Sequence, residues 1–205
     1  MNNRDDFRKW EKYLVAFKIA GRKYYTVWGT DLSSENEDDK FLSNFENNII
    51  CFTSVKQIQT ELLNLKSFFF DKKNLFDFAQ RIAALKTNKI KVYTIDLDFL
   101  HKQLNEMSFS ESFLSEEKFF SEFVVFFNLA GDYVSQVKDS EINNNLLFKG
   151  FLTFWEHFYD YFLWKDSNYD YKNSNIKKTI LSKDKMVLKF ELLLLNFSSR
   201  LTFLN

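Results

Sequence analysis

One group of polar side chains has the residue types that acid–base or metal chemistry uses. Glu156 and Asp160 flank His157 in residues 141–165, a segment that is otherwise apolar on nearly all sides. A histidine between two carboxylates can relay a proton or bind a metal ion. A packed helix also needs a polar stripe facing water, and these residues can form that stripe. We expect the second role.

Two aspartates follow a predicted strand, a position where carboxylates that bind Mg²⁺ are often found. Asp96 and Asp98 come directly after the alternating residues 89–95. Asp96 also fits the N-cap of the next helix, which would place Asp98 in the first turn, where a negative charge is favourable. We expect this structural role, which requires no metal ion.

The sequence contains no recognisable nucleophile or cofactor motif. Cys51, the single cysteine, lies in the apolar run 49–52, where a cysteine usually packs as a small hydrophobic side chain. The four glycines are scattered singly, and the two histidines belong to no Cys/His cluster. We therefore predict no catalytic residues, no metal site and no cofactor, and a protein that is not an enzyme.

Charge is balanced over the whole chain but not locally. Lys plus Arg and Asp plus Glu both number 28, which argues against nucleic-acid binding. Residues 31–46 hold six acids and one lysine, and residues 106–141 hold eight acids and two lysines. Part of the compensating positive charge lies in residues 165–189, with seven lysines and three aspartates.

Acidic patches steer a basic partner toward its binding site, although many charge runs are simply solvated surfaces. We predict partner binding through the acids of both patches: Glu35, Glu37, Asp38, Asp39, Glu46, Glu116, Glu117 and Glu122.

The pattern of apolar residues predicts an α+β protein. Residues 13–20 and 23–28 read as a hairpin joined at Gly21-Arg22, and 49–52 as a short buried strand. Ser54, Asp71, Asp96 and Ser115 are each expected to cap a helix. Further helices are expected over 141–165 and from Met186 onward, whereas 29–48 and 166–183 are expected to be polar loops.

This order gives a small antiparallel or mixed sheet from the N-terminal half, packed with helices, and an all-helical C-terminal half. We predict a single domain, 1–205, in which a mixed half (1–107) and a helical half (108–205) share one core.

A reducing compartment is expected because one cysteine cannot form an internal disulfide. The polar start of the chain is unlike a secretion signal. The longest runs without a charged residue are nine residues, whereas a membrane-spanning helix needs about 20 apolar residues. We predict a cytoplasmic protein that binds no membrane.

The chain resembles the cytoplasmic immunity proteins of bacterial contact-dependent growth inhibition and related polymorphic toxin systems. The run Ile49-Ile50-Cys51-Phe52-Thr53-Ser54 before a helix, the strand entering Asp96-Leu97-Asp98, the stretch 128–133 and the aromatic run 154–163 carry the resemblance. It implies a protein that neutralises a cognate toxin in a 1:1 complex by blocking its active site or substrate cleft. Many such toxins are nucleases with basic clefts, which acidic patches would complement.

Two alternatives remain open at this stage. The chain can instead be an adaptor or regulatory binding protein in a defence or secretion assembly. It can also be an enzyme of unfamiliar type that uses Glu156, His157 and Asp160, or Asp96 and Asp98.

Overall fold

The computed structural model describes residues 10–33, 35–65, 71–108, 110–165 and 175–203. The chain divides into two compact units. Unit 1 comprises Met1–Ile95 and Ser199–Asn205, and unit 2 comprises Asp96–Ser198. The C-terminal segment therefore belongs to the N-terminal unit, a return that the sequence did not suggest. The shared core of the two predicted halves stays a prediction.

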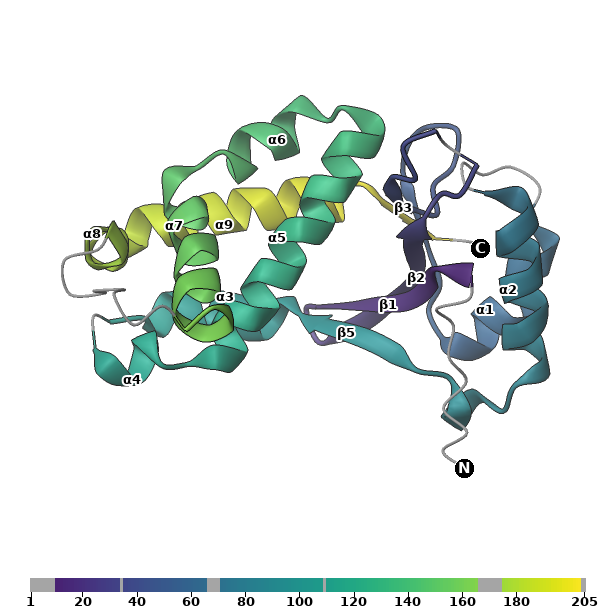
Figure 1. Cartoon of the computed structure of the whole chain (residues 1–205), viewed down its shortest axis with the longest axis horizontal. Coiled ribbons are helices and arrows are strands. Elements are labelled where there is room, and N and C mark those ends of the chain that lie inside the picture. The colour runs from purple at the N-terminus through teal and green to yellow at the C-terminus, as the bar shows by residue number, and fades with distance from the viewer. Residues whose placement is uncertain (1–9, 34, 66–70, 109, 166–174, 204–205) are drawn as a thin grey trace. The chain divides into compact units, whose positions relative to one another are not determined.

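Unit 1 contains a four-stranded sheet of order β3-β2-β1-β5 and a parallel pair, β4 and β6. In Figure 1, α1 and α2 lie side by side in this unit. Its strands are β1 (Lys12–Ile19), β2 (Arg22–Thr30), β3 (Asp39–Phe41), β4 (Ile49–Cys51), β5 (Val92–Asp96) and β6 (Leu201–Phe203). Its helices are α1 (Val55–Glu61), η2 (Leu62–Asn64), α2 (Lys72–Ala84) and η3 (Thr87–Lys89).

The predicted hairpin is confirmed. β1 and β2 pair antiparallel, with Ile19 opposite Arg22. The two turn residues, Ala20 and Gly21, have φ values of 49° and 74°. Positive φ at both positions is typical of the tight turns that suit the twist of a hairpin. The turn therefore lies one residue earlier than expected.

Apolar side chains from the sheet and from α1 and α2 form the core of unit 1. Leu14, Val27, Leu42 and Phe52 come from the strand side and its connections, and helical side chains such as Phe78 face them. Burying each such side chain contributes about 1.5–3 kcal/mol.

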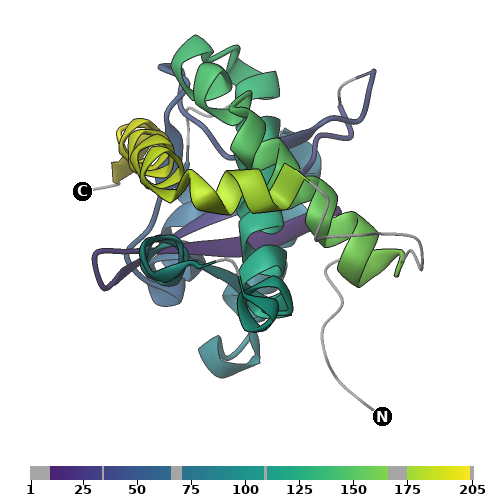
Figure 2. The ribbon, with the colours of Figure 1, turned by 90° about the vertical axis from the view of Figure 1, so that its left-hand side faces the viewer.

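Unit 2 is helical. Figure 2 shows α8 against α7, and the central α5 packs on α3, α6 and α7. The helices are α3 (Leu97–Glu106), α4 (Glu111–Leu114), α5 (Glu117–Val137), α6 (Ser140–Leu146), α7 (Lys149–His157), the π-helix η4 (Phe158–Leu163), α8 (Asn175–Leu181) and α9 (Lys183–Ser198). The α+β fold class is thus confirmed, with β6 as a strand in the mainly helical C-terminal half.

Aromatic rings fill the interior of unit 2. Phe123 of α5 lies 5.6 Å from the Phe151 ring, 5.4 Å from Phe154 and 6.3 Å from Phe190. Most of the surrounding ring pairs are tilted or edge-to-face, the geometry that the aromatic quadrupole favours. These contacts join α5, α7 and α9 into one packed body.

Three of the four predicted helix caps are confirmed. The side chains of Ser54, Asp71 and Asp96 accept hydrogen bonds from the backbone N–H groups of Gln57, Asn74 and Phe99. The prediction at Ser115 is wrong, because Glu116 occupies the N-cap position of α5 without a side-chain hydrogen bond.

Two other predictions are wrong, the first because of a contact distant in sequence and the second because of local conformation. The expected loop 29–48 contains β3, which is held by antiparallel pairing of Trp28 with Phe41. The expected helix 141–165 breaks where Phe148 adopts an extended conformation, after three asparagines that are weak helix formers. The predicted loop 166–183 lies partly outside the described residues, and its described part contains α8.

No helix within the described residues combines the length and the apolar character needed to cross a membrane.

We expect Gly29→Ala to destabilise the fold by about 2–3 kcal/mol. Gly29 has φ +154°, and an added Cβ would lie 2.0 Å from the backbone oxygen of Glu11. Gly131→Ala is the matched control, because nothing lies within 4 Å of its Cβ position in α5. The control should gain about 1 kcal/mol of helix propensity. Urea unfolding measures both, and equal stability of the two variants would contradict the clash.

Candidate functional site

The three residues Glu156, His157 and Asp160 do not converge on one site. His157 is fully buried, whereas Glu156 is exposed and Asp160 is half-buried. The His157 Nε2 lies 3.0 Å from the backbone oxygen of Leu114. Its ring stacks on Tyr161 at 5.2 Å. The imidazole therefore packs and hydrogen-bonds in the interior of unit 2.

Burial lowers the pKa of His157, and the hydrogen bond to the Leu114 carbonyl opposes this shift only in part. The neutral imidazole is consequently the form that the fold holds. Across the described part of the chain, no three His, Cys, Asp or Glu side chains come together in a group that could hold a metal ion.

The Asp96 and Asp98 pair also has structural surroundings. The Asp96 carboxylate accepts from the Phe99 N–H at 2.9 Å, as expected for a cap. The backbone N–H of Asp96 donates to Glu122 Oε2 at 3.3 Å. Glu122, predicted to bind a partner, is half-buried and lies 4.0 Å from the Lys118 ammonium. Its carboxylate thus supports the start of α3.

Cys51 is buried in β4, where it pairs with Phe203 of β6. Burial raises the pKa of its thiol to about 12. At neutral pH the side chain is therefore a protonated thiol packed as a hydrophobic group, as the sequence suggested.

The acids of the first patch divide into anchored and exposed side chains. Asp31 is buried, forms a 2.8 Å ion pair with Lys40, and accepts hydrogen bonds from the N–H and hydroxyl of Ser33. Burial raises the pKa of Asp31, but the bonds from Lys40 and Ser33 outweigh it, so the pKa lies below its ordinary value. Asp39 accepts from the Thr30 hydroxyl at 2.8 Å.

We name the described residues between β2 and β3, 31–33 and 35–38, the acidic hairpin. The Asp31 N–H donates to the Asp38 carbonyl at 2.9 Å and closes the loop. Glu35, Glu37 and Asp38 are exposed on it. Three of the predicted partner-binding acids thus lie on one closed loop whose base is fixed by Asp31 and Lys40.

A buried lysine strengthens the base of the acidic hairpin. The Lys12 ammonium is fully buried, donates to the carbonyls of Trp10 and Thr30, and lies 4.0 Å from Asp71 Oδ2. Burial lowers the pKa of Lys12, and the carboxylate of Asp71 opposes this shift. Because Thr30 is the last residue of β2, the bond to its carbonyl fixes the point where the hairpin begins.

Glu46 and Phe45 lie on a separate turn after β3. The Asn44 side chain accepts from the N–H groups of Glu46 and Asn48 and orders this turn. Phe45 is 63% exposed and Glu46 is exposed beside it. Of the acids predicted in unit 2, Glu116 and Glu117 are exposed at the start of α5.

An exposed leucine face on α9 escaped the sequence analysis. Leu188, Leu192 and Leu195 recur at helical spacing and are 55%, 38% and 66% exposed. The opposite face, with Met186, Phe190, Leu193 and Phe197, is buried. The run of four leucines at 192–195 was the signal in the sequence. Four consecutive residues point to all sides of a helix, so a helix that buries one face exposes some of them.

We expect protonation of His157 to destabilise the fold below about pH 6.5, the ordinary histidine pKa. A folded-state pKa below the unfolded value means that the unfolded chain binds the proton first. Stability is therefore complete above the unfolded pKa and falls as pH drops through it toward the folded pKa. His157→Gln should remove a slope of up to about 1.4 kcal/mol per pH unit.

Urea unfolding at several pH values between 7 and about 5 measures this slope. The control is His101→Gln, because His101 lies at the surface, where its Nε2 is 2.9 Å from Glu191 Oε1. An unchanged slope in His157→Gln would contradict the assignment of the acid sensitivity to His157.

Comparisons with known proteins give the fold alone. No protein-family model and no curated protein match the sequence. A solved structure, the crystal structure of the SatS C-terminal domain in complex with bromine, is similar to this chain with a TM-score of 0.59. The similarity covers 98% of each chain at 14% sequence identity.

Proposed function

We propose that this protein binds a basic protein partner through the acidic hairpin, and that the partner is a bacterial toxin domain that it neutralises in the cytoplasm. The observation that carries the proposal is the set of exposed carboxylates on Glu35, Glu37 and Asp38, held on a closed loop with a buried base. The resemblance to immunity proteins supplies the class of partner.

The fixed base matters because ordering a loop on binding costs free energy. The ion pair between Asp31 and Lys40 and the Thr30–Asp39 hydrogen bond order the ends of the loop before a partner arrives. Less conformational entropy is then lost in the complex. The anchored acids thereby support the exposed ones.

Charge alone provides steering more than affinity, so tight binding needs an apolar anchor as well. Phe45, exposed on its ordered turn beside Glu46, provides a large ring in unit 1. A cationic cleft that accepts the acidic hairpin would be blocked both by charge and by bulk.

Neutralising the hairpin by Glu35→Gln, Glu37→Gln and Asp38→Asn should slow association with the toxin domain encoded immediately upstream. Loss of steering by three charges should lower the association rate about tenfold at low salt and reduce its salt dependence. Surface plasmon resonance across a salt series measures both quantities.

The control replaces Glu61, Glu106 and Glu156, three exposed acids outside the acidic hairpin, by glutamine. It removes the same charge and should retain the wild-type association rate. Equal slowing by both triple variants, or no 1:1 complex with the wild-type protein at micromolar concentration, would refute the proposal.

A second candidate function is an adaptor in a defence or secretion assembly, and the leucine face of α9 favours it. Three leucines aligned on one helix face form an apolar surface of the kind that receives an amphipathic partner helix. In this case the gene neighbourhood would contain assembly components and no toxin.

Leu188→Ser with Leu195→Ser should abolish co-purification with the product of such a neighbouring gene while changing the free energy of unfolding by less than about 1 kcal/mol, because both side chains are exposed. Leu147→Ser, at a 63% exposed leucine elsewhere in unit 2, is the control and should retain the complex. Retention of the complex by the double variant would exclude the α9 face.

A further inference from the structure

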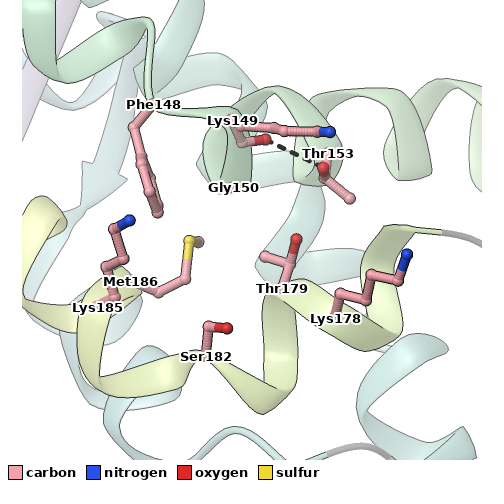
Figure 3. A pocket seen from close by; sticks show the side chains of 9 residues that line it. All are labelled: Phe148, Lys149, Gly150, Thr153, Lys178, Thr179, Ser182, Lys185 and Met186. Atoms are coloured by element: carbon pink, nitrogen blue, oxygen red, sulfur yellow. Dashed lines mark hydrogen bonds between the residues drawn. The ribbon is translucent and has the colours of Figure 1, made fainter.

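A pocket of about 250 Å³ opens in unit 2 between the start of α7 and the turn that joins α8 to α9. Its position is independent of the acidic hairpin, which belongs to unit 1. Figure 3 shows the lining residues: Phe148, Lys149, Gly150, Thr153, Lys178, Thr179, Ser182, Lys185 and Met186.

Three lysines line this small pocket. Lys149 comes from α7, Lys178 from α8 and Lys185 from α9, and the lining contains neither Asp nor Glu. In Figure 3 the Lys185 ammonium lies beside Phe148, and Lys178 lies at the other side of the pocket. Within the described part of the chain, the structure shows no carboxylate paired with any of the three. The lining of the pocket therefore carries positive charge on more than one side.

Packing holds the lysine-bearing segments close together. An added Cβ on the buried Gly150 would lie 2.3 Å from the Met186 sulfur, so α7 and α9 approach as closely as a glycine permits. The Lys185 ammonium lies 5.6 Å from the centre of the Phe148 ring, within the range of a cation–π contact. The positive charge of Lys185 is thus placed at the pocket by an apolar side chain.

Uncharged donors complete the lining. Thr179 and Ser182 carry hydroxyl groups, and Figure 3 shows the Thr179 hydroxyl directed from α8 toward α7. The Thr153 hydroxyl donates to the Lys149 carbonyl at 3.0 Å, which leaves Thr179 and Ser182 as the hydroxyl donors for a ligand. Two helices, α7 and α9, begin at the pocket, and the positive ends of their dipoles favour an anion there.

We propose that this pocket binds a small phosphate-bearing anion. A volume below the roughly 300–1,000 Å³ of pockets for drug-sized ligands suits a compact, highly charged group. Lysines from three different helices surround the pocket, and several ammonium groups can meet the several oxygens of a phosphate or diphosphate, which lysine binds as a point charge. Hydroxyl donors satisfy the remaining oxygens.

Inorganic pyrophosphate is the probe for this site, added at constant ionic strength. Saturable movement of the Gly150 amide resonance in a ¹⁵N–¹H NMR titration is expected, since Gly150 lies in the first turn of α7 at the pocket. Replacing both Lys178 and Lys185 by glutamine should weaken the binding about a hundredfold, at roughly tenfold for each charged donor.

The control replaces Lys138 and Lys177 by glutamine, removing the same charge from exposed positions of unit 2 that do not line the pocket. It should retain the wild-type affinity. Absence of a saturable shift at Gly150 in the wild-type protein, or equal affinity of the two double variants, overturns the proposal.

Circular dichroism checks that the variant Lys178→Gln/Lys185→Gln is folded. If this variant is unfolded, the titration of the wild-type protein by itself tests the anion-binding proposal. The hairpin variant Glu35→Gln/Glu37→Gln/Asp38→Asn should bind pyrophosphate normally. Failure of the proposed partner binding is therefore distinguishable from failure of the anion site.

Discussion

The packing of phenylalanine rings is the constraint on which unit 2 depends. Phe123 of α5 contacts rings of α7 and α9, including Phe154 and Phe190, and tilted or edge-to-face rings leave little freedom for either helix to slide. The same packing decides where polar groups can lie. His157 is held neutral between rings, whereas the starts of α7 and α9 are brought together at Gly150. The lysine-lined pocket is therefore a consequence of how the rings fill the core.

In unit 1, a buried charged group likewise determines where surface residues lie. A buried ammonium is expensive unless its protons find partners. Lys12 meets this requirement with the carbonyls of Trp10 and Thr30 and the nearby Asp71 carboxylate. Because these partners come from separate segments, the buried charge fixes the end of β2 relative to the start of α2. The acidic hairpin begins at that fixed end.

Sequence reasoning succeeded where the controlling physics is local. The caps at Ser54, Asp71 and Asp96 follow from side chains three residues from the amide that they satisfy. It failed where pairing is distant, as for β6, which returns to β4 from the end of the chain. The pocket combines both cases: the lysine-rich stretch 165–189 was visible as positive charge, but only tertiary packing adds Lys149 from α7.

A zero net charge accordingly says little about the local electrostatics of this protein. Salt screens exposed charges over about 8 Å at physiological ionic strength, so a ligand responds to the charges it nearly touches. The acidic hairpin presents carboxylates from one loop of unit 1, and the pocket presents three ammonium groups from three helices of unit 2. Each is strongly charged over a short distance, although the charges of the whole chain sum to zero. Balanced composition argues against a large basic surface, and it is fully compatible with two local surfaces of opposite charge.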